Sequence, residues 1–163
     1  MKLYIESALD FDPETAWDIF ESDEFSARLE SATDLVCTVL NEGTDGDVQT
    51  KTLRYASKRE LPGMVAKALG SKHLAYEQHN RFDPAKSELV WKVIIPGTDR
   101  VDVSGVTTIA ASGSGSKRVV DGDITVRVRF IGGQIEKAVV AEFERSMRRA
   151  VDLARDIHRE RNA

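Results

Sequence analysis

The side chains best suited to acid or base chemistry lie along one predicted strand, His73–Phe82. Glu77, His79 and Arg81 would share one face of it, because successive side chains of a strand point to opposite sides. With Tyr76 adjacent, these groups could transfer protons only if burial shifted their pKa values. A solvated, charged strand face explains the same pattern more simply, so we predict no catalytic residue.

The opposite face of the same strand predicts a pocket for a small molecule. Such sites combine apolar walls, which supply affinity, with a few polar groups that orient the ligand. The alternative is that the apolar residues only fill the core. The candidate pocket-lining residues are Tyr76, Gln78, Asn80, Phe82, Trp91, Val93, Val103 and Thr107 on strands, and Ile135, Val139, Phe143 and Met147 on the C-terminal helix.

A basic segment with apolar residues at its centre lies between residues 58 and 72. Basic side chains near anionic headgroups contribute about 1 kcal/mol each to membrane attraction. This segment is therefore a candidate membrane-contact loop and ligand gate, although an ordinary solvated loop that caps the core is the simpler interpretation. The residues concerned are Lys58, Arg59, Leu61, Met64, Val65 and Lys67.

Other kinds of chemistry find little support in the sequence. The three histidines, His73, His79 and His158, have no cysteine or further ligand at metal-site spacing. The run Gly113–Lys117 (GSGSK) lacks the Gly-Lys-Ser/Thr ending of a phosphate loop and falls between two predicted strands. Cys37 sits in an apolar strand and is expected to be a core residue. We therefore predict no metal and no cofactor.

Composition and charge bound the class of protein. The 163 residues are 41% hydrophobic and 31% charged, with no apolar run of the ~20 residues that span a bilayer. A single cysteine and the lack of a secretory signal predict a cytoplasmic protein. Residues 1–47 hold 13 acidic and two basic residues, within a net charge of −4. This acidic balance argues against nucleic acid as a partner.

The last third of the chain predicts a strand that runs into a long helix. Apolar residues alternate with polar ones up to Phe130, and after Gly132-Gly133 they recur every three or four residues as far as Ile157. Asp121-Gly122-Asp123 is a predicted bulge or bend. The other predicted strands are Lys2–Leu9, Leu35–Leu40, Val48–Ala56, His73–Phe82, Glu88–Ile95, Val101–Ala111 and Val119–Phe130. The other predicted elements are a helix over Pro13–Phe20, a second helix that Ser22 or Asp23 caps and that ends at about Glu30, a loop or short helix over Lys58–Ser71, and turns Glu42–Asp47 and Ser112–Ser116.

This order of elements resembles the helix-grip fold of the START-like, or SRPBCC, superfamily. Asp12-Pro13-Glu14 and the junction Val126–Lys137 (VRVRFIGGQIEK) carry the resemblance. A further resemblance, to PRELI-like phospholipid-transfer proteins, rests on Leu61-Pro62, Leu69-Gly70, Tyr76-Glu77 and Asp83-Pro84. Together these motifs look most like a bacterial family described as domain of unknown function 2505. The resemblance implies a pocket and leaves its ligand open.

We therefore expect a single α+β domain over residues 1–163: a curved antiparallel sheet of about seven strands, two short N-terminal helices and a long C-terminal helix that encloses a pocket. The expected function is binding or transport of a hydrophobic small molecule, lipid or prenyl-like, with transient membrane contact. A small polyketide cyclase, dehydratase or hydrolase in the same cavity is one alternative. Another is a protein-partner module that uses the C-terminal helix, whose polar face is rich in arginine.

Overall fold

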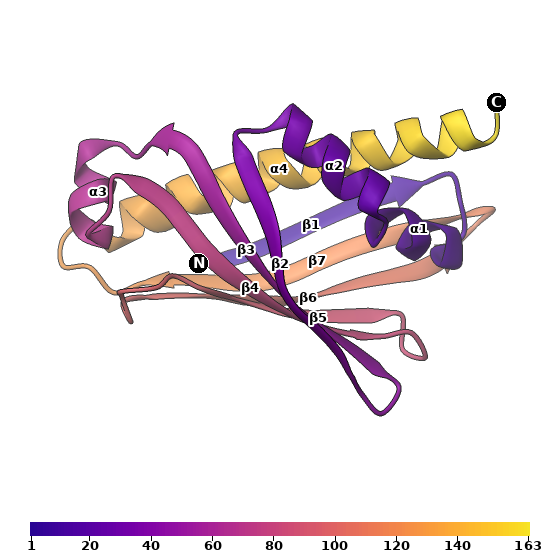
Figure 1. The fold of residues 1–163 in the computed structure, drawn as a ribbon, viewed down its shortest axis with the longest axis horizontal. Helices are drawn as coiled ribbons and strands as arrows, with labels where there is room; N and C mark the ends of the chain where they lie inside the picture. The colour runs from indigo at the N-terminus through magenta and orange to yellow at the C-terminus, as the bar shows by residue number, and fades with distance from the viewer.

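A computed structural model describes residues 1–163 and contains seven strands and four helices in the predicted order (Figure 1). The chain is an α+β protein in which the helices gather on one side of a single sheet. The elements are β1 (Lys2–Leu9), α1 (Pro13–Phe20), α2 (Asp23–Ala32), β2 (Leu35–Asp45), β3 (Val48–Glu60), α3 (Gly63–Leu69), β4 (His73–Asp83), β5 (Glu88–Ile94), β6 (Val101–Ser112), β7 (Gly115–Val126) and α4 (Gly132–Arg161).

The sheet has the strand order β1-β7-β6-β5-β4-β3-β2, and every neighbouring pair is antiparallel. The first two strands of the chain therefore form its two opposite edges, and α1 and α2 carry the chain from one edge to the other. The sheet is curved and strongly twisted, and α4 runs across its inner face (Figure 1). This arrangement confirms the predicted helix-grip fold.

The two N-terminal helices begin where the sequence predicts them. The side chain of Asp12 accepts a hydrogen bond from the Thr15 amide at 2.8 Å, and Pro13 occupies the first turn of α1. Ser22 caps α2 in the same way, since its hydroxyl oxygen accepts from the Phe25 amide at 3.2 Å. These local bonds satisfy amides that the first turn of a helix cannot pair internally.

The predicted final strand was wrong in its bounds. The structure places β7 four residues earlier than Val119–Phe130, because its pairing with β1 continues back to Ser116 opposite Leu9. Beyond Val126 the chain turns, and Phe130 adopts a positive φ of 69° with 90% of its surface exposed. The alternation of apolar residues simply continues past the end of the strand.

The predicted turn Glu42–Asp47 was also too long. Strand β2 continues to Asp45, and Gly46, with a φ of 62°, forms a tight turn with Asp47 into β3. The register of β2 and β3 shifts between Val39 and Asn41, which is a bulge that the sequence pattern does not reveal.

The predicted bulge at Asp121-Gly122-Asp123 is absent, since the register there is unbroken on both sides. Gly122 instead pairs with Gly105, and both make room for the indole of Trp91. A Cβ on Gly105 would lie 2.5 Å from Trp91 Cζ2 and 2.5 Å from the carbonyl oxygen of Asp121. The indole Nε1 donates to Thr107 Oγ1 at 3.1 Å, so the ring is fixed on the inner face of the sheet.

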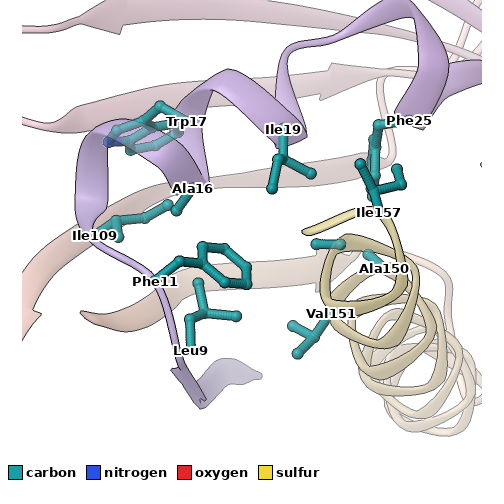
Figure 2. Close-up of a cluster of buried hydrophobic side chains, with 11 residues drawn as sticks. Leu9, Phe11, Ala16, Trp17, Ile19, Phe25, Ile109, Ala150, Val151 and Ile157 are labelled. Carbon is teal, nitrogen blue, oxygen red and sulfur yellow. The ribbon is translucent and has the colours of Figure 1, made fainter. Parts of the chain in front are cut away.

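Two apolar clusters hold α4 in place. The first joins β1, α1 and α2 to the C-terminal half of α4, where Phe11 and Ile19 face Val151 and Ile157 (Figure 2). The second packs the N-terminal half of α4 against the sheet and contains Trp91, Val93, Val103 and Ile135. The predicted apolar stripe of the helix is thus used within the fold.

The glycine pair beneath Trp91 generates a stability prediction. We expect Gly105→Ala to lower the free energy of unfolding by about 1–3 kcal/mol, because the new methyl group must displace the indole or a backbone carbonyl. Urea denaturation followed by circular dichroism measures this change.

Gly133→Ala is the matched control, since an added Cβ at this α4 residue meets no atom within 4 Å. It should be neutral or stabilise by up to about 1 kcal/mol. Equal losses in the two variants would contradict the role of Gly105.

Candidate functional site

The inner face of the sheet carries those predicted pocket-lining residues that lie on strands. Asn80 pairs with Trp91 and Gln78 with Val93 across β4 and β5, so these side chains share one face. The amide of Gln78 donates to Asn80 Oδ1 at 2.9 Å. From α4, Phe143 stacks on Trp91 with ring centroids 6.3 Å apart.

The remaining predicted residues lie on the same inner surface or on the helix above it. Thr107 is buried beside Trp91, whereas Phe82 belongs to the other apolar cluster, with its ring 4.6 Å from that of Trp17. The other six pack in or against the cluster under α4: Tyr76, Val93, Val103, Ile135, Val139 and Met147.

The charged face of β4 points away from α4. Glu77 lies 3.6 Å from Arg54 and 3.3 Å from His79, and Arg81 pairs with Asp45 at 2.9 Å. These are partly exposed ion pairs on the outer face of the sheet, of the kind that stabilise a protein little. The acid or base role considered for Glu77, His79 and Arg81 therefore has no support from their position.

The inner face is divided by the position of α4. Within the sheet this helix packs against β7 and β1, and its other main contacts are with α1 and α2. Its backbone stays farther from β2, β3 and β4. On that uncovered side Tyr55 and Tyr76 remain half-buried and stack with ring centroids 5.1 Å apart, beside the half-buried Cys37.

Burial raises the pKa of the Tyr55 and Tyr76 phenols and that of the Cys37 thiol. All three groups therefore keep their protons at neutral pH. The two phenols can donate hydrogen bonds to a ligand, but none of the three groups is a ready base or nucleophile.

A hollow of about 400 Å³ opens at the end of the sheet nearest the β2–β3 turn. Phe82 and Leu89 provide its apolar surface. Its polar lining comes from Glu21, Glu42, Gly43, Thr44, Gln49, Thr50, Lys51 and Asn80. Two predicted pocket residues, Asn80 and Phe82, thus line this hollow.

A second hollow, of about 430 Å³, lies beside α3 and is mainly polar. It is formed by residues 67–70 of α3 and its end, and by residues 97–100 of the β5–β6 connection. The predicted membrane-contact residue Lys67 lines it.

The candidate membrane-contact segment spans the end of β3 and all of α3. Val65 packs against the cluster under α4, whereas Met64 is 54% exposed. Arg59 forms an ion pair with Asp34. The six predicted residues therefore divide between strand, connection and helix: Lys58 and Arg59 on β3, Leu61 after it, and Met64, Val65 and Lys67 on α3.

The sequence interpretation missed Arg118 on β7, which is only 9% exposed. Its Nη1 and Nη2 both donate to the thioether sulfur of Met147 at 3.6 Å, and its guanidinium lies 4.7 Å from the centre of the Phe20 ring. No carboxylate pairs with it. Burial lowers its pKa to about 10, so it remains charged at neutral pH.

The signal for Arg118 was present in the sequence. Arg118 falls in phase with Val120, Gly122 and Ile124, which all lie on the inner face. The predicted strand begins only at Val119, so the prediction assigns Arg118 to neither face of the sheet.

The structure contains no group of three or more His, Cys, Asp or Glu side chains placed to hold a metal ion. The Nδ1 atom of His73 lies 3.1 Å from the carbonyl oxygen of Arg59, and the ring of His158 packs 4.5 Å from that of Phe11. None of the helices is long and apolar enough to cross a bilayer.

Solved structures with the same fold include a Zhui aromatase/cyclase from Streptomyces sp. R1128, at a TM-score of 0.72 and 12% identity over 100% of this chain and 96% of that one. A START superfamily protein from Mycobacterium smegmatis matches at a TM-score of 0.62 and 15% identity, over 92% and 93% of the two chains. Ara h 8.0201 matches at 0.58 and 12%, over 93% and 94%.

A comparison with curated proteins finds no match. The sequence comparison with protein families does find one, and it agrees with the fold. The model of a family described as a protein of unknown function, DUF2505, matches residues 5–157. The chain, whose own fold is the START-like helix grip, therefore belongs to this family.

Proposed function

We propose that this protein reversibly binds and carries a hydrophobic small molecule, of lipid or prenyl type, between the sheet and α4. The observation that carries the proposal is the uncovered side of the inner face. There α4 stands off from β2, β3 and β4, and Tyr55 and Tyr76 stay half-buried beside Leu53. A mixed apolar surface that the protein itself does not fully cover is suited to a ligand.

The chemistry of this surface fits such a ligand. Burying apolar ligand area is worth roughly 25 cal/mol per Å² before the costs of association, so about 300 Å² gives roughly 7 kcal/mol of gross stabilisation. Gln78, Asn80 and the two protonated phenols supply the few polar groups that would orient the ligand. The fold shared with START-like proteins supports the same conclusion.

The predicted membrane contact belongs to this proposal. The exposed Met64 and the exposed Lys67 lie on α3, whose Val65 contacts the cluster beneath α4. A transient contact of α3 with an anionic bilayer would bring the apolar cluster close to a lipid source. The single free cysteine, Cys37, suits action in a reducing compartment such as the cytoplasm.

Cyclase-type chemistry in the same space is the second candidate. The favouring observation is the stacked pair Tyr55 and Tyr76, whose protonated phenols could polarise a substrate carbonyl. The fold is shared with an aromatase/cyclase. Turnover of a reactive polyketide chain, lost in a Tyr55→Phe, Tyr76→Phe double variant that still binds dodecanol, would favour this candidate over a carrier.

The carrier proposal is tested by native mass spectrometry of the purified protein, with solvent extraction and mass identification of any bound compound. A direct titration with dodecanol follows. We expect Val139→Trp to weaken dodecanol binding by about tenfold or more, because the indole would occupy space between α4 and the sheet, where Val139 is half-buried against the apolar cluster.

Val90→Trp is the matched control, since Val90 lies on the outer face of β5 and is 42% exposed. It should bind dodecanol like the unaltered protein. The proposal fails if no lipid-like compound is recovered and dodecanol does not bind, or if both tryptophan variants bind it unchanged.

A further inference from the structure

We propose that Arg118 receives the anionic head of the ligand, so that the natural ligand is an amphiphile with an apolar body and a carboxylate or phosphate group. This inference rests on the carrier function proposed above. It narrows the ligand class from hydrophobic molecules in general to acidic ones.

The first argument is the missing counter-ion. Arg118 is buried on the inner face, and its neighbours in register, Ser7 on β1 and Ile109 on β6, carry no charge. Phe20 and Met147 contact its guanidinium, and no ion pair reaches it. A charge removed from water without a partner is costly, and proteins rarely keep one unless it is used.

The second argument is the geometry of the guanidinium. Its two terminal nitrogens donate to a single point, the sulfur of Met147, at 3.6 Å each. A fork of two parallel N–H groups is the arrangement that binds carboxylate or phosphate oxygens in a bidentate manner. A thioether is a weak acceptor on a flexible side chain, so an anion could displace it at small cost.

The third argument is access. The Phe20 ring that covers the guanidinium is half-buried at the end of α1, and the next residue, Glu21, lines the hollow of about 400 Å³. Met147 belongs to α4 and is half-buried where it packs against the apolar cluster. Phe20 and Met147 both contact the guanidinium through side chains that can rotate, so either could uncover it without breaking backbone structure.

A purely structural role for Arg118 makes a different prediction about the empty protein. If the role of Arg118 is to bind a ligand, Arg118→Met should leave the melting temperature unchanged or raise it, because a buried unpaired charge is replaced by an apolar side chain. Thermal unfolding of protein stripped of lipid measures this. A fall of more than about 4 °C would assign Arg118 a structural role and overturn the inference.

The direct test compares three ligands with the same twelve-carbon chain: dodecanoate, dodecyl phosphate and dodecanol. Calorimetric titration at pH 8, below micelle concentrations, gives each dissociation constant. We expect at least one anion to bind roughly tenfold or more tightly than the alcohol. The tighter of the two anions distinguishes a carboxylate ligand from a phosphate one.

Arg118→Gln should abolish this preference and leave dodecanol binding unchanged. Arg145→Gln is the control, since Arg145 is exposed on the outer side of α4 and pairs with Glu142, and it should keep the preference. Equal binding of the three ligands by the unaltered protein would overturn the inference and leave the carrier function intact. Failure of all three to bind would overturn both.

Discussion

The structure depends on one constraint: the C-terminal helix α4 is much narrower than the sheet against which it packs. Seven antiparallel strands span roughly 29 Å at ~4.8 Å per strand, whereas an α-helix with its side chains is only ~10–12 Å across. A single helix can therefore cover about two or three strands. Helix α4 covers β7 and β1, and α1 and α2 cover the adjoining end. On the inner face of β2, β3 and β4, Leu53 is buried, but Cys37, Tyr55 and Tyr76 are left half-buried. The half-buried surface is a consequence of this geometry.

The distance between α4 and the sheet is fixed at both ends of the helix. At its start, Glu136 accepts a hydrogen bond from the Val126 amide at 2.9 Å, and a Cβ on Gly132 would lie 2.4 Å from the Val126 carbonyl oxygen. At its other end, Ala154 and Ile157 are fully buried among α1, α2 and β1. These contacts at both ends hold α4 over β7 and β1, away from β3 and β4.

The sequence predicted the features that local chemistry decides. The caps at Asp12 and Ser22, the element order and the division of β4 into a polar outer and a mixed inner face all follow from residue type and period. The predicted end of β7 was wrong because the alternation of apolar and polar residues continues past the strand, as far as Phe130. Its predicted start was wrong because pairing with the distant strand β1 extends β7 back past Arg118. The hollows could not be predicted, because each is lined by segments that lie far apart in the sequence, such as Glu21, Thr50 and Leu89.

The position of Arg118 makes the two sides of the inner face of the sheet chemically different. The guanidinium lies on the covered side, on β7, whereas the half-buried aromatic surface of Tyr55 and Tyr76 lies on β3 and β4. Three strand spacings, roughly 14 Å, separate β7 from β4. A neutral apolar molecule would cover the surface between these strands but leave the buried charge of Arg118 unpaired, at the same cost in free energy. An amphiphile could pair its anionic head with Arg118 under α4 and pack its apolar tail on the aromatic surface of β3 and β4.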